Sequence, residues 1–232
     1  RGIFMETNIL KAICNLTKIK NNDLKNIYKG SNRANIVGEA LEYYIKDLFC
    51  DSFGAKDINK KDKAYSKYFS YIGNQNNPPD FIISEGDALE VNKTKGTEGI
   101  VLNSPYPKSK LYTESPMITQ ACRDCEEWQA KDLIYSIGTV LSGKLKLLWM
   151  IYGDCFVADK DIYKGIRNKI SGDMNELSDM ELSDAGPSTV DPLGITRFSL
   201  RSSCTVDNPV KIFDYAVPIN QNIKFSVKAI LS

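Results

Sequence analysis

The 232-residue sequence contains no histidine. This absence excludes catalysis by Ser-His-Asp or Cys-His groups, metal sites that depend on histidine, and nucleases that use a histidine base. Hydrolytic chemistry in this chain would have to depend on carboxylates, lysines and a bound metal ion, because a divalent metal can activate the water that histidine prepares in other enzymes.

Cysteine is scarce, and its six positions are scattered along the chain. That spacing is too sparse for a disulfide scaffold in a protein of this length. Cys122 and Cys125 form one C-x-x-C motif, but no second pair and no histidine completes the four ligands of a structural zinc site. Two reduced thiols on one helix face are the favoured interpretation, and a small zinc-binding interaction domain is the remote alternative.

No apolar run is long enough to cross a membrane. The longest, Leu145–Tyr152, is interrupted by Lys146 and is much shorter than a membrane-spanning helix. The first residues lack the basic region and the long apolar stretch of a signal peptide. Met5 is a candidate natural start, which would make Arg1–Phe4 an added extension. We expect a soluble, cytoplasmic protein without a membrane partner.

The net charge of +1 gives little indication of a nucleic-acid partner. The distribution of charge is more informative, because residues 171–196 contain six acids and neither lysine nor arginine. Without these six acids the 30 basic residues face 23 acidic ones, a balance of +7. We therefore expect residues 171–196 to form an acidic, solvated insertion, and a basic surface could exist elsewhere on the molecule.

The length and the hydrophobic fraction of 42% fit one domain over residues 1–232. Apolar spacing and capping residues predict helices at Ile9–Ile19, Asn35–Phe49, most of Ser115–Leu141, and Asp159–Ile170. Strands are predicted at Phe81–Ser84, Ala88–Lys93, Lys144–Gly153 as a buried strand, and in alternating stretches from Ile195 onward, including "KIFDYAV". This mixture predicts an α/β fold with a central mixed sheet flanked by helices.

The stretch "NNPPDFIISEGDALEVNK" places two acids on neighbouring strands. Asp80 begins the first strand, after two prolines that favour an extended entry, and Glu90 lies in the second strand. Pairing of the strands through the "EGD" turn would bring the two carboxylates together, where they repel unless a cation lies between them. A hard ion such as Mg²⁺ prefers oxygen ligands. We therefore expect Asp80, Glu90 and the backbone carbonyl of Val91 to bind Mg²⁺.

A third acid could come from the helix at Asn35–Phe49. On a helical wheel Glu42 falls near the border of the apolar stripe, whereas Glu39 points into solvent. Glu42 is therefore the candidate that can reach a site at the edge of the sheet. The alternative, a surface acid without a catalytic role, stays open.

The order of these motifs is that of the PD-(D/E)XK nuclease superfamily. Asp80, nine residues and Glu90 follow an upstream helix with the pattern G-x-x-L-E. From Ile9 to Asp214 the chain also resembles the NgoPII-type family of type II restriction endonucleases, in blocks such as "GEALEYYIKDLF", "YFSYIGNQNNPPDFIISEGDALEVNK", "ACRDCEEW", "KLKLLWMIYGDC" and "DPLGITRFSLR".

The resemblance implies a restriction-endonuclease-like PD-(D/E)XK core. It also implies a homodimeric, Mg²⁺-dependent enzyme that cuts double-stranded DNA at a short palindromic, GC-rich site of the GGCC type. Such an enzyme is paired functionally with a cognate DNA methyltransferase. A repair-type nuclease on the same core is an alternative.

Asn92 departs from the superfamily pattern, which has lysine at this position. Glu90 and Asn92 share one face of their strand, so Lys93 lies on the opposite face. Three interpretations stay open. Asn92 holds the attacking water through its amide oxygen, Lys93 or Lys95 reaches the site, or the position has been changed to give a protein that binds DNA without cutting it. We expect slow or absent cleavage, with metal and DNA binding retained.

Residues that could contact DNA are amides just before Asp80 and basic side chains elsewhere. Arginine and lysine are the usual partners of guanine, and amides contact bases or phosphates. Each candidate could equally be a turn residue or a surface charge. The candidates are Asn74, Gln75, Asn76, Lys108, Lys110, Arg123, Arg197 and Arg201.

Overall fold

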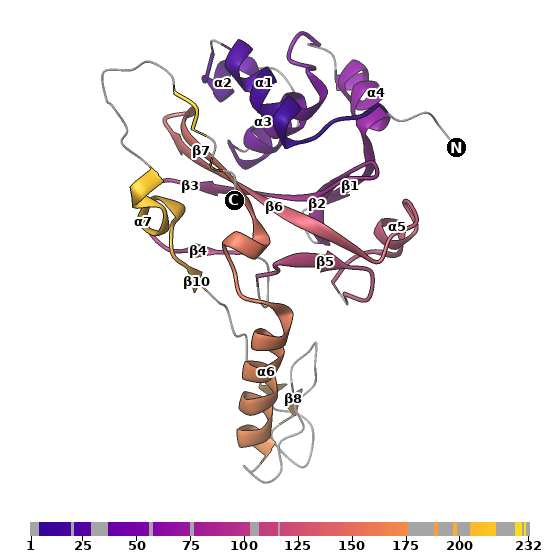
Figure 1. Ribbon diagram of the computed structural model, residues 1–232, viewed down its shortest axis with the longest axis vertical. Helices are drawn as coiled ribbons and strands as arrows, with labels where there is room; N and C mark the ends of the chain where they lie inside the picture. The colour runs from indigo at the N-terminus through magenta and orange to yellow at the C-terminus, as the bar shows by residue number, and fades with distance from the viewer. Residues whose placement is uncertain are drawn as a thin grey trace.

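The protein is described here by a computed structural model (Figure 1). It describes residues 5–19, 21–28, 37–55, 58–74, 77–102, 107–115, 117–175, 188–189, 197–198, 205–216, 226–228 and 230, with only the backbone at 37–39, 58–59, 74, 167, 170–175, 188–189 and 197–198. The elements are α1 (Ile9–Lys18), α2 (Leu24–Ile27), α3 (Val37–Cys50), α4 (Ile58–Tyr68), β1 (Phe69–Asn74), β2 (Asn77–Ile83), β3 (Ala88–Thr94), β4 (Ile100–Val101), β5 (Lys110–Tyr112), α5 (Gln120–Arg123), β6 (Ala130–Leu141), β7 (Lys144–Tyr152), η1 (Gly153–Cys155), α6 (Lys160–Asn175), β8 (Ser188–Thr189), β9 (Arg197–Phe198), β10 (Thr205–Val206), α7 (Pro209–Ile212) and η2 (Asp214–Ala216).

A mixed sheet forms the centre of the molecule (Figure 1). Its strand order is β1-β2-β3-β6-β5, and β7 pairs with β6 beside β5. β3 and β6 run parallel, whereas the β1–β2, β2–β3, β5–β6 and β6–β7 pairs are antiparallel. The predicted α/β fold with a mixed sheet flanked by helices is confirmed at this level.

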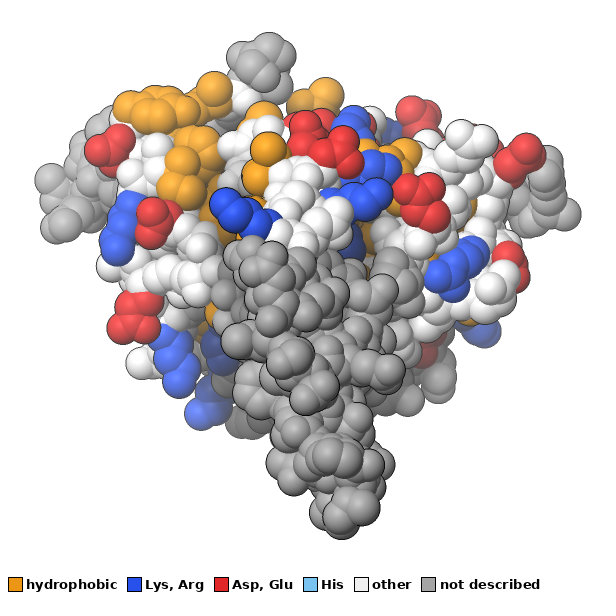
Figure 2. All heavy atoms as spheres, turned by 90° about the horizontal axis from the view of Figure 1, so that it is seen from below, with side chains coloured by type: hydrophobic (Ala, Val, Ile, Leu, Met, Phe, Trp, Pro, Cys, Tyr) orange, Lys and Arg blue, Asp and Glu red, His pale blue; other side chains and the backbone are white. Residues whose placement is uncertain are grey.

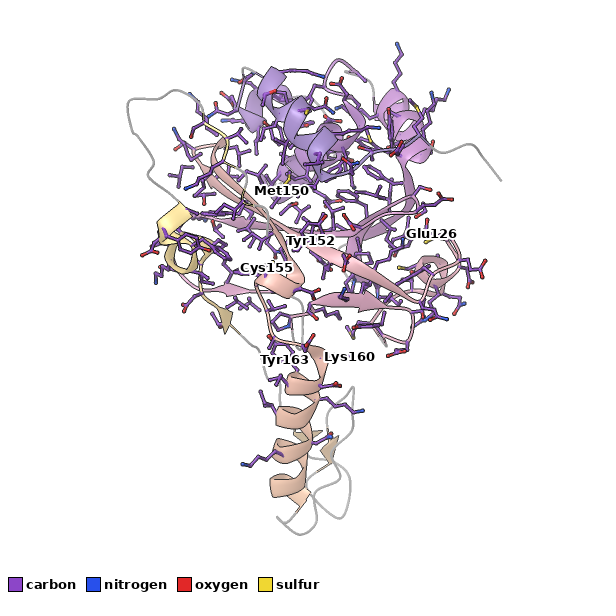
Figure 3. All side chains as sticks on the ribbon, in the orientation of Figure 1. Glu126, Met150, Tyr152, Cys155, Lys160 and Tyr163 are labelled. Atoms are coloured by element: carbon purple, nitrogen blue, oxygen red, sulfur yellow. The ribbon has the colours of Figure 1, made fainter. Side chains whose placement is uncertain are left out.

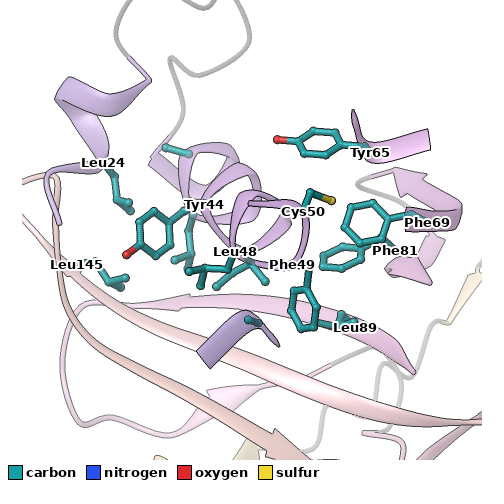
Figure 4. Close-up of a cluster of buried hydrophobic side chains, with 14 of the residues drawn as sticks. Leu24, Tyr44, Leu48, Phe49, Cys50, Tyr65, Phe69, Phe81, Leu89 and Leu145 are labelled. Atoms are coloured by element: carbon teal, nitrogen blue, oxygen red, sulfur yellow. The ribbon is translucent and has the colours of Figure 1, made fainter. Parts of the chain in front are cut away.

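Helices α1 to α4 cover one face of the sheet (Figure 1). The apolar stripe of α3 is fully buried at Leu41, Ile45 and Leu48, as its spacing predicts. These side chains pack with Phe81 and Leu89 from the sheet (Figure 4). Each such burial contributes about 1.5–3 kcal/mol relative to an exposed side chain, so α3 is fixed firmly above the strands that carry the two acids.

A buried aspartate ties α3 to its neighbours. Asp47 is fully buried and accepts hydrogen bonds from Tyr28 Oη at 2.7 Å, Tyr65 Oη at 2.7 Å and Ser52 Oγ at 2.5 Å. It also forms an ion pair with Lys61 of α4. Buried charges are tolerated when they are paired and hydrogen-bonded, and this network fixes α3 relative to α4 and to the end of α2.

The prediction for Ser115–Leu141 was wrong over most of its length. Among the described residues of this range only α5 is helical, and β6 is a twelve-residue strand at the centre of the sheet. Leu133 through Ile137 are all buried, because helices or loops cover both faces of this strand. A continuous apolar run has no alternation, so its periodicity cannot distinguish a strand from a buried helix. Cys125 lies beyond α5, so the two cysteines of the C-x-x-C motif do not share a helix face.

Two further boundaries and the burial of one strand differ from the predictions. β2 begins at Asn77, so Pro78 and Pro79 lie inside the strand rather than before it. β7 is only partly buried, because it pairs with β6 along one side. α6 projects from the body (Figure 1) and continues to Asn175, so the predicted acidic insertion begins inside a helix.

The predicted strand "KIFDYAV" contributes to α7 and η2 instead. Asn208 caps α7 by accepting a hydrogen bond from Val210 N at 3.1 Å, and Pro209 occupies the first turn. Both residues are helix-start signals that the alternation of apolar residues concealed. Among the described residues, no helix combines the length and apolar character needed to cross a membrane.

Candidate functional site

Asp80 and Glu90, the two acids predicted to bind a metal ion, lie at the end of the β2–β3 ladder. The ladder pairs Ile82 with Ala88 and Phe81 with Leu89, so the next two facing positions are Asp80 and Glu90. Asp80 Oδ2 accepts a hydrogen bond of 2.6 Å from Val91 N, and Glu90 is buried. The structure therefore brings the two predicted metal ligands to adjoining positions.

Side-chain alternation fixes this register. Phe81 and Leu89 pack in the core beneath α3, whereas Ile82 and Ala88 belong to the core on the other face of the sheet. A slip of one residue would exchange these faces. The acids therefore lie opposite each other because the apolar residues next to them are sorted between two cores.

Backbone packing fixes the start of β2. A Cβ at Gly73 of β1 would lie 2.1 Å from the carbonyl oxygen of Pro79, closer than any side chain allows. Glycine is needed there because β1 approaches the prolines this closely. Gly73 thus allows β1 to support the residue that precedes Asp80.

The surroundings of Asp80 disfavour its charged form. Burial and the charge of Glu42 raise the pKa of Asp80 to about 7, against the lowering effects of the Val91 N–H group and Lys46. A cation next to the carboxylate would relieve both causes. The available donors are carboxylate oxygens and the Val91 carbonyl, which in a strand faces the same side as the Val91 N–H group. Such oxygen donors suit a hard divalent ion.

Glu42 lies near Asp80, as its effect on the pKa of Asp80 requires. Its carboxylate is engaged by Lys46, whose Nζ donates a 2.5 Å hydrogen bond to Glu42 Oε1. The Lys46 ammonium lies 5.9 Å from the ring centroid of Phe81 and 5.7 Å from that of Tyr43. The sequence reasoning missed Lys46, although the i,i+4 Glu–Lys spacing on a helix was a signal for this pair.

A second lysine lies on the other side of Glu90. Lys108 N donates to Tyr135 Oη at 2.8 Å, and the same hydroxyl donates to Lys108 O at 2.8 Å. Tyr135 is the register partner of Glu90 on the parallel strand β6. Burial lowers the pKa of Lys108, and the charge of Glu90 opposes that shift. Lys108, expected at the DNA surface, is therefore partly buried beside the acid pair.

Asn92 lies two register positions beyond Glu90, on the same face of β3, and pairs with Ile137, which in turn pairs with Trp149. The Asn92 Nδ2 and Trp149 Nε1 atoms are buried, and neither has a hydrogen-bond partner within the described part of the chain. Buried donors without partners are unusual in native proteins and often mark a place where a ligand or water binds. Two N–H donors of this kind thus lie along one row of the sheet, and the Asn92 donor is two positions beyond Glu90 on β3.

The remaining candidates for DNA contact are spread over the molecule. Lys110 Nζ pairs with Asp132 at 2.7 Å and with Asp154 at 3.3 Å. Arg123 donates to the carbonyl oxygens of Thr113 at 2.9 Å and Ser115 at 2.8 Å. The structure thus gives both side chains partners within the protein. Residues 75, 76 and 201 and the side chains of 74 and 197 lie outside the described residues.

The face of the molecule seen in Figure 2 does not show a single basic patch among the described residues. On the face seen in Figure 2, lysine and arginine side chains alternate with acidic ones. Among the residues that the structure describes, no three Cys, Asp or Glu side chains converge as a metal-binding group. The candidate site is therefore a pair of acids with one backbone carbonyl, bordered by Lys46 on the α3 side and Lys108 on the other.

Comparisons with known proteins agree with the resemblance seen in the sequence. Residues 7–232 match the model of the NgoPII restriction endonuclease family. The chain is 38% identical over 231 residues to the type II restriction enzyme NgoPII of Neisseria gonorrhoeae, an alignment that covers 97% of this chain and 83% of the relative. No solved structure matches the chain. With a family match over nearly its whole length, this chain belongs to the NgoPII restriction endonuclease family.

Proposed function

We propose that this protein is a type II restriction endonuclease that hydrolyses phosphodiester bonds of double-stranded DNA. The observation that carries the proposal is the pair Asp80 and Glu90 at adjoining positions of β2 and β3, in a chain of this family. The proposal includes a PD-(D/E)XK core within one domain over residues 1–232. It also includes a short palindromic, GGCC-like site, a homodimer whose two-fold symmetry matches the palindrome, and a cognate DNA methyltransferase.

Asp80, Glu90 and the Val91 carbonyl would hold Mg²⁺. When bound, the ion would lower the pKa of a water molecule and neutralise charge on the scissile phosphate. The residues around Asp80 prepare the site for such a cation. Burial and Glu42 make the bare carboxylate unfavourable, while the Val91 N–H group holds it in position.

Lys46, on the α3 side of the site, affects the charge of Glu42 and does not bind the metal ion. Its ion pair neutralises Glu42 and thereby limits the repulsion that Glu42 exerts on Asp80. Asn92 offers an amide group two positions beyond Glu90 on the same face of β3. An amide can hold a water or a phosphate oxygen by hydrogen bonding, but it adds no positive charge.

A second candidate function follows from Asn92. A chain without the usual lysine could bind its DNA site and fail to cut it. The two functions differ in one experiment. The purified protein is incubated with unmethylated plasmid DNA and Mg²⁺, with an EDTA control, and the variants Asn92→Lys and Asp80→Asn are run in parallel.

Discrete fragments from the natural sequence, lost in EDTA and in Asp80→Asn, are the expected result. Mapping of the fragment ends then gives the recognition site. Fragments from Asn92→Lys alone would favour the DNA-binding candidate, and an unspecific smear would favour a repair-type nuclease. Absence of cleavage by every variant over long incubation would refute the nuclease proposal.

A further inference from the structure

We propose that Lys108 is a catalytic residue whose ammonium contacts the scissile phosphate beside Glu90. It would thereby supply, from the segment ahead of β5, a positive charge that Asn92 cannot supply from β3. The inference rests on the proposed nuclease function and assigns one more residue to it. Three observations carry it: how the Lys108 backbone is held, what surrounds its ammonium, and where the other nearby lysines lie.

The backbone of Lys108 is held at three points. Tyr135 Oη bonds to both its N and its O atoms. Gly153, at the start of η1, approaches so closely that a Cβ there would lie 2.2 Å from Ser109 O and 2.9 Å from Lys108 O. Ser109 Oγ donates to Asp159 Oδ1 at 3.3 Å, just before the first turn of α6, where Lys160 and Tyr163 lie (Figure 3). A catalytic group requires this kind of fixed support.

The Lys108 ammonium is in an unusual place for a lysine. Its Nζ atom is buried, and within the described part of the chain it makes no hydrogen bond. Removing an ammonium from water is costly unless other groups replace its hydration. Glu90 is the charged group that acts on Lys108. The Lys108 ammonium makes no hydrogen bond within the described part of the chain, so its N–H groups are suited to bind an anion such as a phosphate.

The other lysines near the acids are less suitable. Lys46 lies on the α3 side, where Glu42 neutralises it and where it lies over aromatic rings. Lys93 follows Asn92 on β3 and so projects to the opposite face from Glu90. The backbone of Lys108 is bonded to Tyr135, the register partner of Glu90. The Tyr135 side chain belongs to the core on the face of the sheet opposite α3. Asn92 projects from β3 toward that same face.

The reaction balances without any further reactant. The oxygen of a water molecule forms a bond to phosphorus, the bond from phosphorus to the 3′ oxygen breaks, and one water proton ends on that oxygen. The second water proton is released to solvent, leaving a 5′ phosphate and a 3′ hydroxyl group. Lys108 stays protonated throughout and donates N–H groups to a non-bridging oxygen as negative charge accumulates there.

The test uses the full chain and four forms: the natural sequence, Lys108→Met, Asn92→Lys and the double variant. Single-turnover cleavage of a plasmid with mapped sites is measured in Mg²⁺, together with affinity for a fragment that contains one site. Lys108→Met should lower the cleavage rate about 10²- to 10³-fold and change the affinity only a few-fold. The double variant should cleave at least about tenfold faster than Lys108→Met, because Asn92→Lys returns a positive charge to the same side of Glu90.

Lys63→Met is the matched control, since it removes an exposed lysine of α4. Its cleavage rate should equal that of the natural sequence. Circular dichroism and thermal unfolding of each variant confirm that it is folded; methionine keeps the length of the lysine side chain, so Lys108→Met should fold.

Each other outcome overturns the inference. Cleavage by Lys108→Met at the natural rate would show that Lys108 is not catalytic, while the nuclease proposal would stand. A loss of cleavage rate in Lys108→Met that persists in the double variant would indicate that Lys108 has a structural role. Cleavage by Asn92→Lys but not by the natural sequence would show that Lys108 does not replace the missing charge. If no form cleaves, the nuclease proposal itself fails, and the inference with it.

Discussion

Replacing Asp80 by asparagine should stabilise the metal-free protein, and the gain should grow with pH. The carboxylate of Asp80 is disfavoured by burial and by Glu42, which together raise its pKa to about 7. Asparagine keeps an oxygen that can accept the Val91 N–H group, but it carries no charge. The variant therefore removes an unfavourable charge and keeps the hydrogen bond.

The size of the effect follows from the pKa difference. A carboxyl with a pKa near 7 when folded and 3.8 when unfolded binds more protons in the folded state between these values, so stability falls as pH rises through that range. One pKa unit corresponds to about 1.4 kcal/mol, so ionised Asp80 costs up to about 4 kcal/mol at pH 8 and under about 1 kcal/mol near pH 4. Side-chain and water rearrangement reduce this upper bound, and we expect about 2 kcal/mol at pH 8.

Thermal unfolding in EDTA between pH 4 and pH 8 measures this difference. A gain of 2 kcal/mol should raise the Tm of a protein of this size by about 4–8 °C at pH 8, with little change near pH 4. Asp62→Asn, at an exposed position of α4, is the matched control and should leave Tm nearly unchanged. Mg²⁺ should stabilise the natural sequence and not Asp80→Asn. The prediction concerns the gain in Tm of Asp80→Asn over the natural sequence. A gain that is smaller at pH 8 than at pH 4 would refute the reasoning.

Three other perturbations test separate parts of the structure. Glu90→Gln should reduce single-turnover cleavage by at least about 10²-fold, with DNA affinity retained in a binding assay; cleavage within tenfold of the natural rate would exclude Glu90 as a ligand. Lys61→Met leaves the buried carboxylate of Asp47 without its cation and should cost about 3 kcal/mol in urea unfolding, whereas a loss under about 1 kcal/mol would show that the three hydroxyl donors suffice. Gly153→Ala should displace Ser109 and Lys108, cost about 1–3 kcal/mol and slow cleavage, and an alanine variant with full activity and stability would contradict the close approach.

The sequence was sufficient to predict the parts of the fold that depend on local periodicity. The apolar stripe of α3 could be predicted because a helix with one buried face leaves a regular pattern. The hairpin of β2 and β3 is buried on both faces, but its two short apolar runs and the "EGD" turn between them were sufficient to predict it. β6 could not be predicted in this way, because Leu133 through Ile137 are buried on both faces of the sheet and do not alternate with exposed residues. The helix α7 was missed because its cap, Asn208, follows a stretch that alternates like a strand.

Some residues of the candidate site could likewise be predicted from the sequence, and others could not. Asp80 and Glu90 are separated by one turn, so strand geometry alone could bring them together. Lys108 reaches the acids only through the tertiary contact with Tyr135, a residue of a strand that the sequence reasoning assigned to a helix. Lys46 and its pair Glu42 lie on one helix, but their position above the acids depends on how α3 packs on the sheet.

The contact between Lys108 and Tyr135 also has a consequence for the order of folding. The two acids come together in a hairpin between strands adjacent in the chain, and such local pairings form early. Lys108 takes its position only after β6 has paired with β3, a parallel pairing between strands far apart in the chain, which costs more loop-closure entropy and is slower. During synthesis both acids also leave the ribosome before β6 does. An enzyme that needs Lys108 to cut would thus leave DNA intact until β6 has paired with β3.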